Sequence, residues 1–157
     1  MTEQSSDLTP FPILAGELRR NIDAAMPKLR AVLDGAAAQP ITPGKWSSKQ
    51  VIGHLIDSAA NNHQRFVRAQ EGPSLEFPPY IQDHWVLAQH HQDRSWDELT
   101  TFWHLYNHHL AHVMERIPEG HRGVRCTIGT EKTVTLGFLV HDYIVHLRHH
   151  LRQAGVL

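Results

Sequence analysis

The chain has 157 residues, a formal net charge of -1 and a single cysteine. This length suits one domain, residues 1–157, whose hydrophobic core needs no disulfide, and the near-zero charge argues against a nucleic-acid binder. Because there is neither an apolar run of about 20 residues nor a secretion signal at the N-terminus, we expect a cytoplasmic protein without a membrane span.

The first predicted helix follows a short arm. Residues 1–10 read as a loose segment, and apolar residues spaced three and four apart then predict a helix over 11–33. Pro27 lies inside this pattern, and we expect it to kink the helix. A connector with two prolines follows over 35–44.

The second predicted helix has a clear start signal. Ser47 and Gln50 form the Ser-x-x-Gln pattern of a capping box, in which each residue satisfies a backbone N–H of the other. We expect this helix to begin there and to continue to about residue 70. The segment 72–94 contains three prolines and is predicted to be a long irregular connector.

A second capping-box pattern marks the third helix. It is formed by Ser95 and Glu98, and the helix is expected to end at Ile117, before a proline. Alternating apolar residues over 120–135 predict a short β-hairpin or an extended loop, and the fourth helix should follow over 135–154. Four helices without an internal repeat predict an all-α four-helix bundle, with the directions of the helices left open.

Histidine, the commonest metal ligand, supplies 14 of the 157 residues. Two of the predicted helices carry histidines four residues apart, which places their side chains on one face. On the third helix, His104, His108 and His112 lie at least about 120° from the centre of the apolar stripe. We therefore expect them to face solvent or a partner subunit. The stripe consists of Leu99, Phe102, Tyr106, Leu110, Val113 and Ile117.

Three other histidines lie beside apolar faces. On the fourth helix, His150 falls inside the apolar arc and His146 about 20° beyond its edge. On the second helix, His54 lies about 60° past the apolar arc, in a polar stripe typical of a pocket wall. Three neutral imidazoles that leave one coordination position of a metal open are typical of a catalytic metal site. The alternative is that the three are ordinary histidines at the interface between helices. The apolar arc of the fourth helix comprises Leu136, Leu139, Val140, Tyr143, Leu147 and Leu151. That of the second helix comprises Val51, Ile52, Leu55, Ala59 and Phe66.

Several segments resemble the DinB superfamily, in particular its YfiT-like branch. They are 43–47 (PGKWS), 51–58 (VIGHLIDS), 61–66 (NNHQRF), 133–136 (TVTL) and 146–150 (HLRHH). The resemblance implies a four-helix bundle with rearranged connectivity that is usually a homodimer. It also implies a divalent ion, zinc or nickel, held by three histidines that correspond to His54, His146 and His150. The family includes metal-dependent hydrolases and enzymes that use low-molecular-weight thiols as co-substrates.

Together these observations predict a divalent-metal-dependent enzyme that acts on a small molecule. Water activated at the open position would make it a hydrolase, and a thiol ionised there would make it a thiol transferase. Two alternatives remain: a non-catalytic stress protein that sequesters a metal or small ligand, and a metal-free dimeric scaffold associating through the third helix.

Two further residues are candidates for the catalytic machinery. Asp142 lies one turn before His146 and is predicted to orient the free ring nitrogen of that imidazole, unless it is a surface charge. Arg65 is predicted to pair with a carboxylate of the substrate or thiol, unless it belongs to a structural ion pair. No residue is assigned as a general base.

Overall fold

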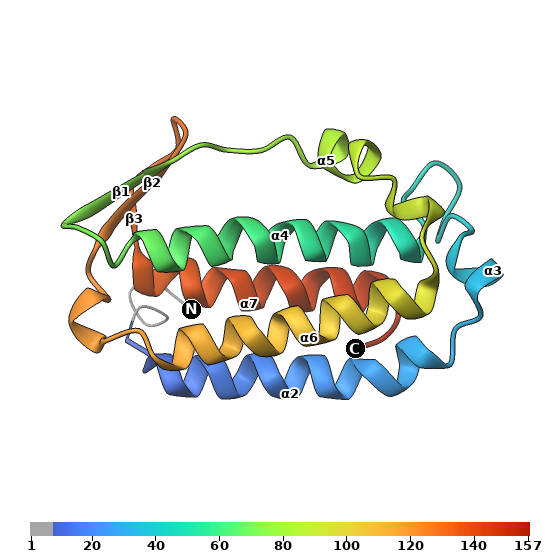
Figure 1. Ribbon diagram of the computed structural model, residues 1–157, viewed down its shortest axis with the longest axis horizontal. Coiled ribbons are helices and arrows are strands. Elements are labelled where there is room, and N and C mark those ends of the chain that lie inside the picture. Colours follow the sequence, from blue (N-terminus) through green and yellow to red (C-terminus); the bar gives the residue numbers. More distant parts are fainter. Residues whose placement is uncertain (1–7) are drawn as a thin grey trace.

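Four long helices dominate the computed structural model, which describes residues 8–157 (Figure 1). They confirm the predicted all-α four-helix bundle, whereas most of the predicted N-terminal arm, residues 1–7, lies outside the described residues. The long helices are α2 (Phe11–Arg30), α4 (Ser48–Arg68), α6 (Trp96–Glu115) and α7 (Leu136–Gln153). The short helical elements are α3 (Asp34–Ala37), α5 (Gln82–Ala88), η1 (His91–Asp93) and η2 (Glu119–His121).

Both predicted side-chain caps are present, at the starts of α4 and α6, but the capping box is complete only at α4. Ser47 Oγ accepts a hydrogen bond from the Gln50 N–H, and Gln50 Oε1 accepts one from the Ser47 N–H, which confirms the first capping box. At α6, Ser95 Oγ accepts from the Glu98 N–H. The reciprocal bond is not formed between these residues, because the Glu98 carboxylate lies 3.6 Å from Arg94 instead.

Helix α2 is shorter than predicted. It ends at Arg30, three residues after Pro27, rather than at residue 33. A proline lacks an N–H and crowds the carbonyl four residues before it, so its position in the last turn favours the end of the helix. Leu33, which was expected to continue this helix, is 78% exposed.

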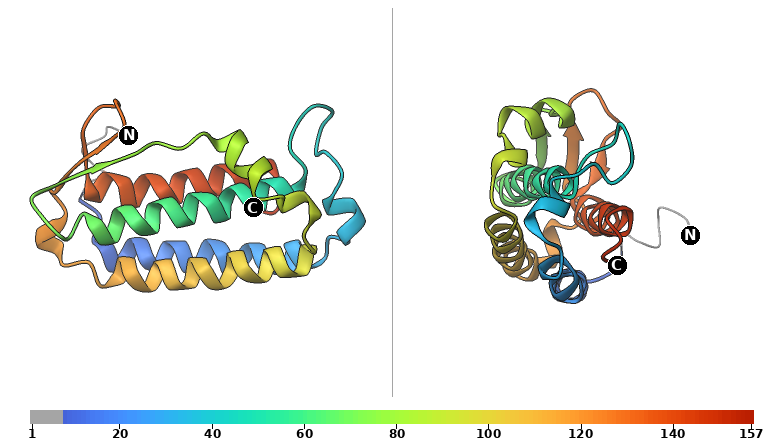
Figure 2. Two further views of the ribbon diagram at one scale, coloured as in Figure 1. Left: turned by 45° about the horizontal axis from the view of Figure 1, so that its top comes forward. Right: turned by 90° about the vertical axis from the view of Figure 1, so that its right-hand side faces the viewer.

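The four helices pack in a closed ring in the order α2, α6, α4, α7. Figure 1 shows that α4 and α6 run in the same direction, opposite to α2 and α7. The segment between α4 and α6 therefore returns along the whole bundle before α6 begins, as the turned view in Figure 2 also shows. This arrangement makes α4 and α7 antiparallel neighbours, which matters for the histidines they carry.

A small sheet closes one end of the bundle. Its strands are β1 (Ser74–Phe77), β2 (Arg125–Ile128) and β3 (Val134–Thr135), in that spatial order. The antiparallel pair of β2 and β3 confirms the hairpin alternative for 120–135. Strand β1 lies in the segment predicted to be irregular, and its parallel pairing with β2 ties that segment to the end of the bundle where α7 begins.

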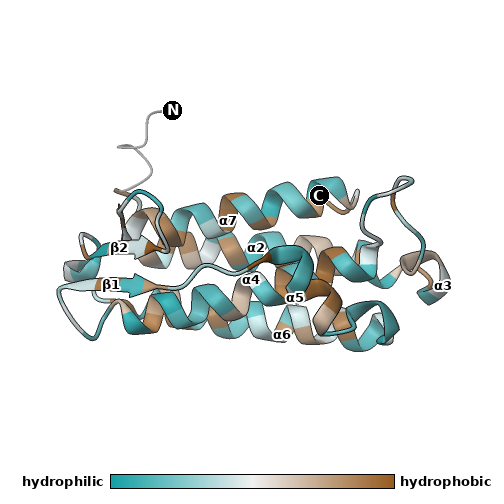
Figure 3. Ribbon diagram, turned by 90° about the horizontal axis from the view of Figure 1, so that it is seen from above, coloured by the Kyte–Doolittle hydropathy of each residue, from teal (hydrophilic) through white to brown (hydrophobic). Residues whose placement is uncertain are grey.

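The core confirms the apolar faces predicted for α4 and α7 but not the one predicted for α6. Every residue of the two predicted arcs is buried. On α6, Phe102 is 45% exposed, while Trp103 and Asn107 are fully buried. The buried face is displaced because α6 packs against both α2 and α4, and the Asn107 side chain accepts a hydrogen bond from the Tyr143 hydroxyl. Figure 3 shows hydrophobic and hydrophilic segments alternating along the long helices.

Candidate metal centre

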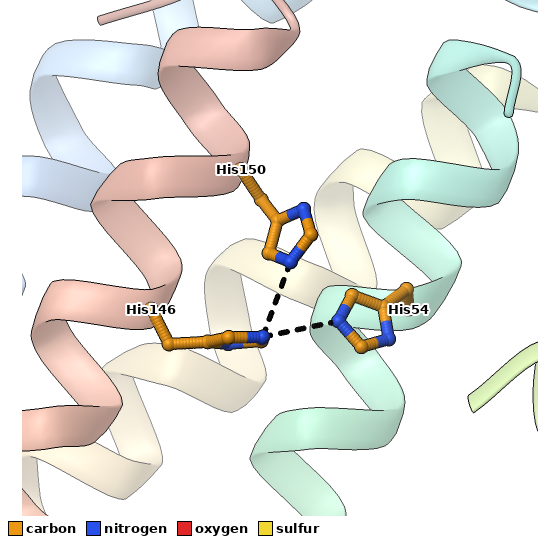
Figure 4. Close-up of side chains that lie close together, drawn as sticks. All are labelled: His54, His146 and His150. Carbon is orange, nitrogen blue, oxygen red and sulfur yellow. Dashed lines mark hydrogen bonds between the residues drawn. The ribbon is translucent and has the colours of Figure 1, made fainter. Parts of the chain in front are cut away.

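Two antiparallel helices bring the three selected histidines to one point. His54 comes from α4, and His146 and His150 come from successive turns of α7. The Nε2 atom of His146 lies 3.2 Å from Nε2 of His54 and 3.1 Å from Nε2 of His150. Figure 4 shows the three rings turned toward one another. We call this group the histidine cluster; that its members are metal ligands stays a prediction.

The spacing within the histidine cluster fits a metal ion. A neutral imidazole carries one N–H, so Nε2 of His146 cannot donate hydrogen bonds to both neighbouring nitrogens. Around zinc, with Zn–N distances of about 2.0–2.1 Å, tetrahedral ligand atoms lie about 3.3–3.4 Å apart. The observed 3.1 Å and 3.2 Å are close to that separation. Imidazole also suits nickel, copper and iron, so the donor set does not select one ion.

Burial keeps these imidazoles in the neutral form that binds a metal. It lowers the pKa of His54 to about 3, with the charges of His150 and His146 acting in the same direction. Burial also lowers the pKa of His150 to about 4, and its neighbours His146 and His149 add to the effect. The pKa of His146 is lowered by burial and by His149. At neutral pH no proton competes with a metal for these nitrogens.

The lowered pKa values predict that the metal-free protein loses stability in mild acid. Below the unfolded-state pKa of about 6.5, the unfolded chain binds protons that folded His54 and His150 exclude until the pH approaches 3 to 4. The loss approaches about 1.4 kcal/mol per pH unit for the fully buried His54. Urea unfolding at pH 7.5 and 5.0 measures it. His54→Ala should show a smaller decrease between these pH values, and an unchanged decrease would contradict the assignment.

Two neighbouring side chains contact the rings of the histidine cluster. Trp46 packs against His54 with ring centroids 5.1 Å apart, and Ser58 Oγ lies 3.5 Å from Nδ1 of His146. Within residues 8–157 no hydrogen bond joins Asp142 to His146, and the role of Asp142 in orienting this imidazole stays a prediction. The imidazole of His146 reaches across to α4 to meet His54, and its Nδ1 therefore faces Ser58 on that helix.

Cavities lie on both sides of the histidine cluster along the bundle. One of about 550 Å³ is lined by Trp46 and Gln153, near the start of α4 and the end of α7. Another of about 260 Å³ is lined by Ser58 and His146 and extends toward the opposite ends of these helices. We call the second one the polar cavity. Arg65, Asp142, Glu131, Lys132 and Tyr80 are among its lining residues.

A buried pair beside the cluster was missed by sequence reasoning. His91 Nε2 lies 3.1 Å from Asp57 Oδ1, and both side chains are almost fully buried. Gln89 donates a second hydrogen bond to the same oxygen, at 2.6 Å. These contacts attach α5 and η1 to α4 one turn from His54. The available signal was Gly53, since a glycine inside a helix often marks a close approach by another segment.

A second group with metal-binding residue types lies on the opposite side of α6. Asp23 Oδ1 lies 3.0 Å from Nε2 of His104 and 2.8 Å from Nε2 of His108. These two histidines were expected to face solvent or a partner, but they are half-buried and join α6 to α2. Each distance is that of an ordinary hydrogen bond to a carboxylate, so the contacts need no ion.

The fold and the histidine cluster together define a four-helix bundle with a partly buried three-imidazole site suited to a divalent metal. The chain belongs to the DinB superfamily, whose sequence model matches residues 17–154. Its fold is similar to that of YfiT from Bacillus subtilis, described as a probable metal-dependent hydrolase with an unusual four-helix bundle topology. The match has a TM-score of 0.75 and 16% identity, and covers 98% of this chain and 85% of that one. No curated protein matches this chain in sequence.

Proposed function

We propose that the protein is a divalent-metal-dependent enzyme that acts on a small molecule at the histidine cluster. The observation that carries the proposal is the approach of three neutral imidazole nitrogens, one from a buried and two from half-buried histidines, to one point. The polar cavity beside His146 supports it, because a reacting molecule needs space next to the metal. The description of YfiT as a probable metal-dependent hydrolase is consistent with this proposal.

The chain would hold the ion through Nε2 of His54, His146 and His150, leaving a coordination position toward solvent or the cavities. A bound divalent ion supplies Lewis acidity, which ionises water or a thiol at neutral pH. The protein contributes rigid placement: Trp46 packs against one ring, and Ser58 lies against another. Ser58 also places a hydroxyl at the boundary between the cluster and the polar cavity.

The residues around the cluster favour thiol transfer over hydrolysis. Hydrolysis of an ester or amide requires a proton for the leaving group, usually delivered by a general acid. Within the described part of the chain, no carboxylate is hydrogen-bonded to the three rings, and Ser58 offers only a hydroxyl. A thiol that is ionised before it reacts with a small electrophile needs less proton transfer. We therefore propose a thiol transferase first and a hydrolase second.

Turnover assays test this function. Protein loaded with zinc or nickel is incubated with a chloro-nitroaromatic electrophile and glutathione, bacillithiol or mycothiol, and in parallel with a panel of small esters and amides. We expect thiol-dependent turnover that falls by more than about 100-fold when the metal is removed, because even residues that only orient metal ligands are worth about 10–100-fold. His104→Ala is the matched control and should retain the activity.

Each result of the assays has a defined meaning. Metal-dependent ester or amide cleavage without thiol turnover would establish the hydrolase instead. Stoichiometric metal without turnover in either assay would leave the non-catalytic binding protein as the function.

Three other expectations stay predictions: the homodimer, the cytoplasmic location and the small-molecule thiol partner. Within residues 8–157, no helix is long and apolar enough to cross a membrane. The homodimer is proposed from the family resemblance, and exposed Phe102 and Leu105 on α6 offer apolar surface for it.

A further inference from the structure

Arg65 is a partly buried cation that has no ionic partner. Its Nε is buried without a hydrogen bond, and no carboxylate of residues 8–157 forms an ion pair with its guanidinium. The guanidinium carbon lies 5.5 Å from the centroid of the Phe77 ring. Burial lowers the pKa of Arg65, yet an arginine remains charged at neutral pH. Removing a charge from water without a partner is unfavourable, so an anion at this position would be stabilising.

The polar cavity connects this cation to the histidine cluster. Arg65, Ser58 and His146 all line it, and Ser58 contacts His146 directly. Ser58 and Arg65 are seven residues apart on α4, which corresponds to about 10 Å along the helix axis. A small molecule can therefore reach both ends of the cavity only if its reacting atom and its charged group are separated by roughly this distance.

Acidic side chains lining the same cavity restrict the charge of a ligand. The negative charges of Glu131 and Asp142 partly oppose the lowering of the pKa of Arg65 by burial, although neither carboxylate forms an ion pair with it. Asp142 is exposed at the margin of this cavity, and its negative charge would still repel an anion bound at Arg65. The guanidinium fork remains available to bind a carboxylate through two parallel hydrogen bonds.

We infer that Arg65 binds a carboxylate of the small molecule that reacts at the histidine cluster, and so determines specificity for anionic substrates or co-substrates. This inference rests on the proposed function, because the cluster has to be the reacting end. It identifies the ligand as elongated and acidic at the end remote from the reacting atom. Arg65 is a specificity-determining residue that is separated from the metal by the length of the cavity.

Two probes that differ only at one end test the inference. 6-Mercaptohexanoate and 6-mercaptohexanol share a thiol and a six-carbon chain, but only the first carries a carboxylate. Their dissociation constants are measured by calorimetry on zinc-loaded and on metal-free protein. We expect the acid to bind at least about 10-fold more tightly than the alcohol, as for a charge-assisted hydrogen-bonded pair.

Variants separate recognition by Arg65 from a structural role. Arg65→Gln should abolish the preference for the acid and leave the affinity for the alcohol unchanged, whereas Arg65→Lys should keep part of the preference. Asp142→Asn should tighten binding of the acid several-fold, because it removes a repelling charge. Arg68→Gln is the matched control: Arg68 lies one turn further on α4, is exposed, and bonds Gln64. It should change neither affinity.

The outcomes also separate this inference from the proposed function. Equal binding of both probes, or a preference for the acid that survives Arg65→Gln, overturns the inference and leaves the metal site untouched. A preference for the acid that depends on Arg65 in a protein that binds neither zinc nor another divalent transition metal supports the arginine site and overturns the metal-dependent enzyme. Failure of both probes to bind in either form overturns the inference.

Discussion

The substitutions His54→Ala and His150→Ala are each expected to lower the zinc affinity of the protein by more than about 100-fold. Residues that only orient metal ligands are typically worth about 10–100-fold, and removing a ligand costs more. Each substitution leaves two of the three imidazoles. His146 lies close to both of the residues replaced, so each variant retains one close pair of imidazoles. Elemental analysis after dialysis of protein without a histidine tag should give one ion per unmodified chain and almost none in either variant.

The Asp23 group provides a matched control for this prediction. His104 and His108 also lie four residues apart on a helix, and both contact one carboxylate. The double substitution His104→Ala/His108→Ala should leave one bound ion per chain. If metal survives both histidine-cluster substitutions and disappears in this control, the metal site lies between α2 and α6 and the proposed function is wrong. Circular dichroism of each variant verifies that the helices are intact.

Local periodicity was sufficient to predict the two faces that carry the cluster. The apolar arcs of α4 and α7 are each continuous, and their polar margins contain His54, His146 and Ser58. Successive side chains on a helix are rotated by about 100° about its axis, so the sequence alone predicts that these histidines lie beside buried surface. The DinB resemblance selected the same three residues, by an independent argument.

What the sequence did not reveal depends on contacts between distant segments. The burial of Trp103 and Asn107 follows from the position of α6 between two neighbours, which periodicity within one helix cannot encode. Pairing of β1 with β2 joins residues about fifty positions apart in the chain, and neither strand shows a long alternating pattern. The directions of the four helices likewise follow from the return of the segment after α4.

The substitution Gly53→Ala is expected to destabilise the protein by about 3–5 kcal/mol, although alanine favours helices over glycine by about 1 kcal/mol. A Cβ atom at this position would lie 2.3 Å from two ring atoms of His91, closer than such atoms approach. The imidazole would have to leave its place, which breaks its hydrogen bond with buried Asp57 and leaves that carboxylate without this partner. Thermal unfolding should show a decrease in Tm of roughly 10 °C.

Gly16 offers a control with the same helical position and no such neighbour. Both glycines are the sixth residue of a long helix, but a Cβ at Gly16 meets only the end of the Arg20 side chain, at 3.4 Å. Gly16→Ala should therefore be neutral or stabilising by up to about 1 kcal/mol. In Gly53→Ala/His91→Ala the clash is absent, so the double variant should be more stable than the sum of the single effects by about 1–3 kcal/mol. If the effects of the two substitutions on stability are strictly additive, the close approach of His91 to α4 is not the reason that position 53 requires glycine.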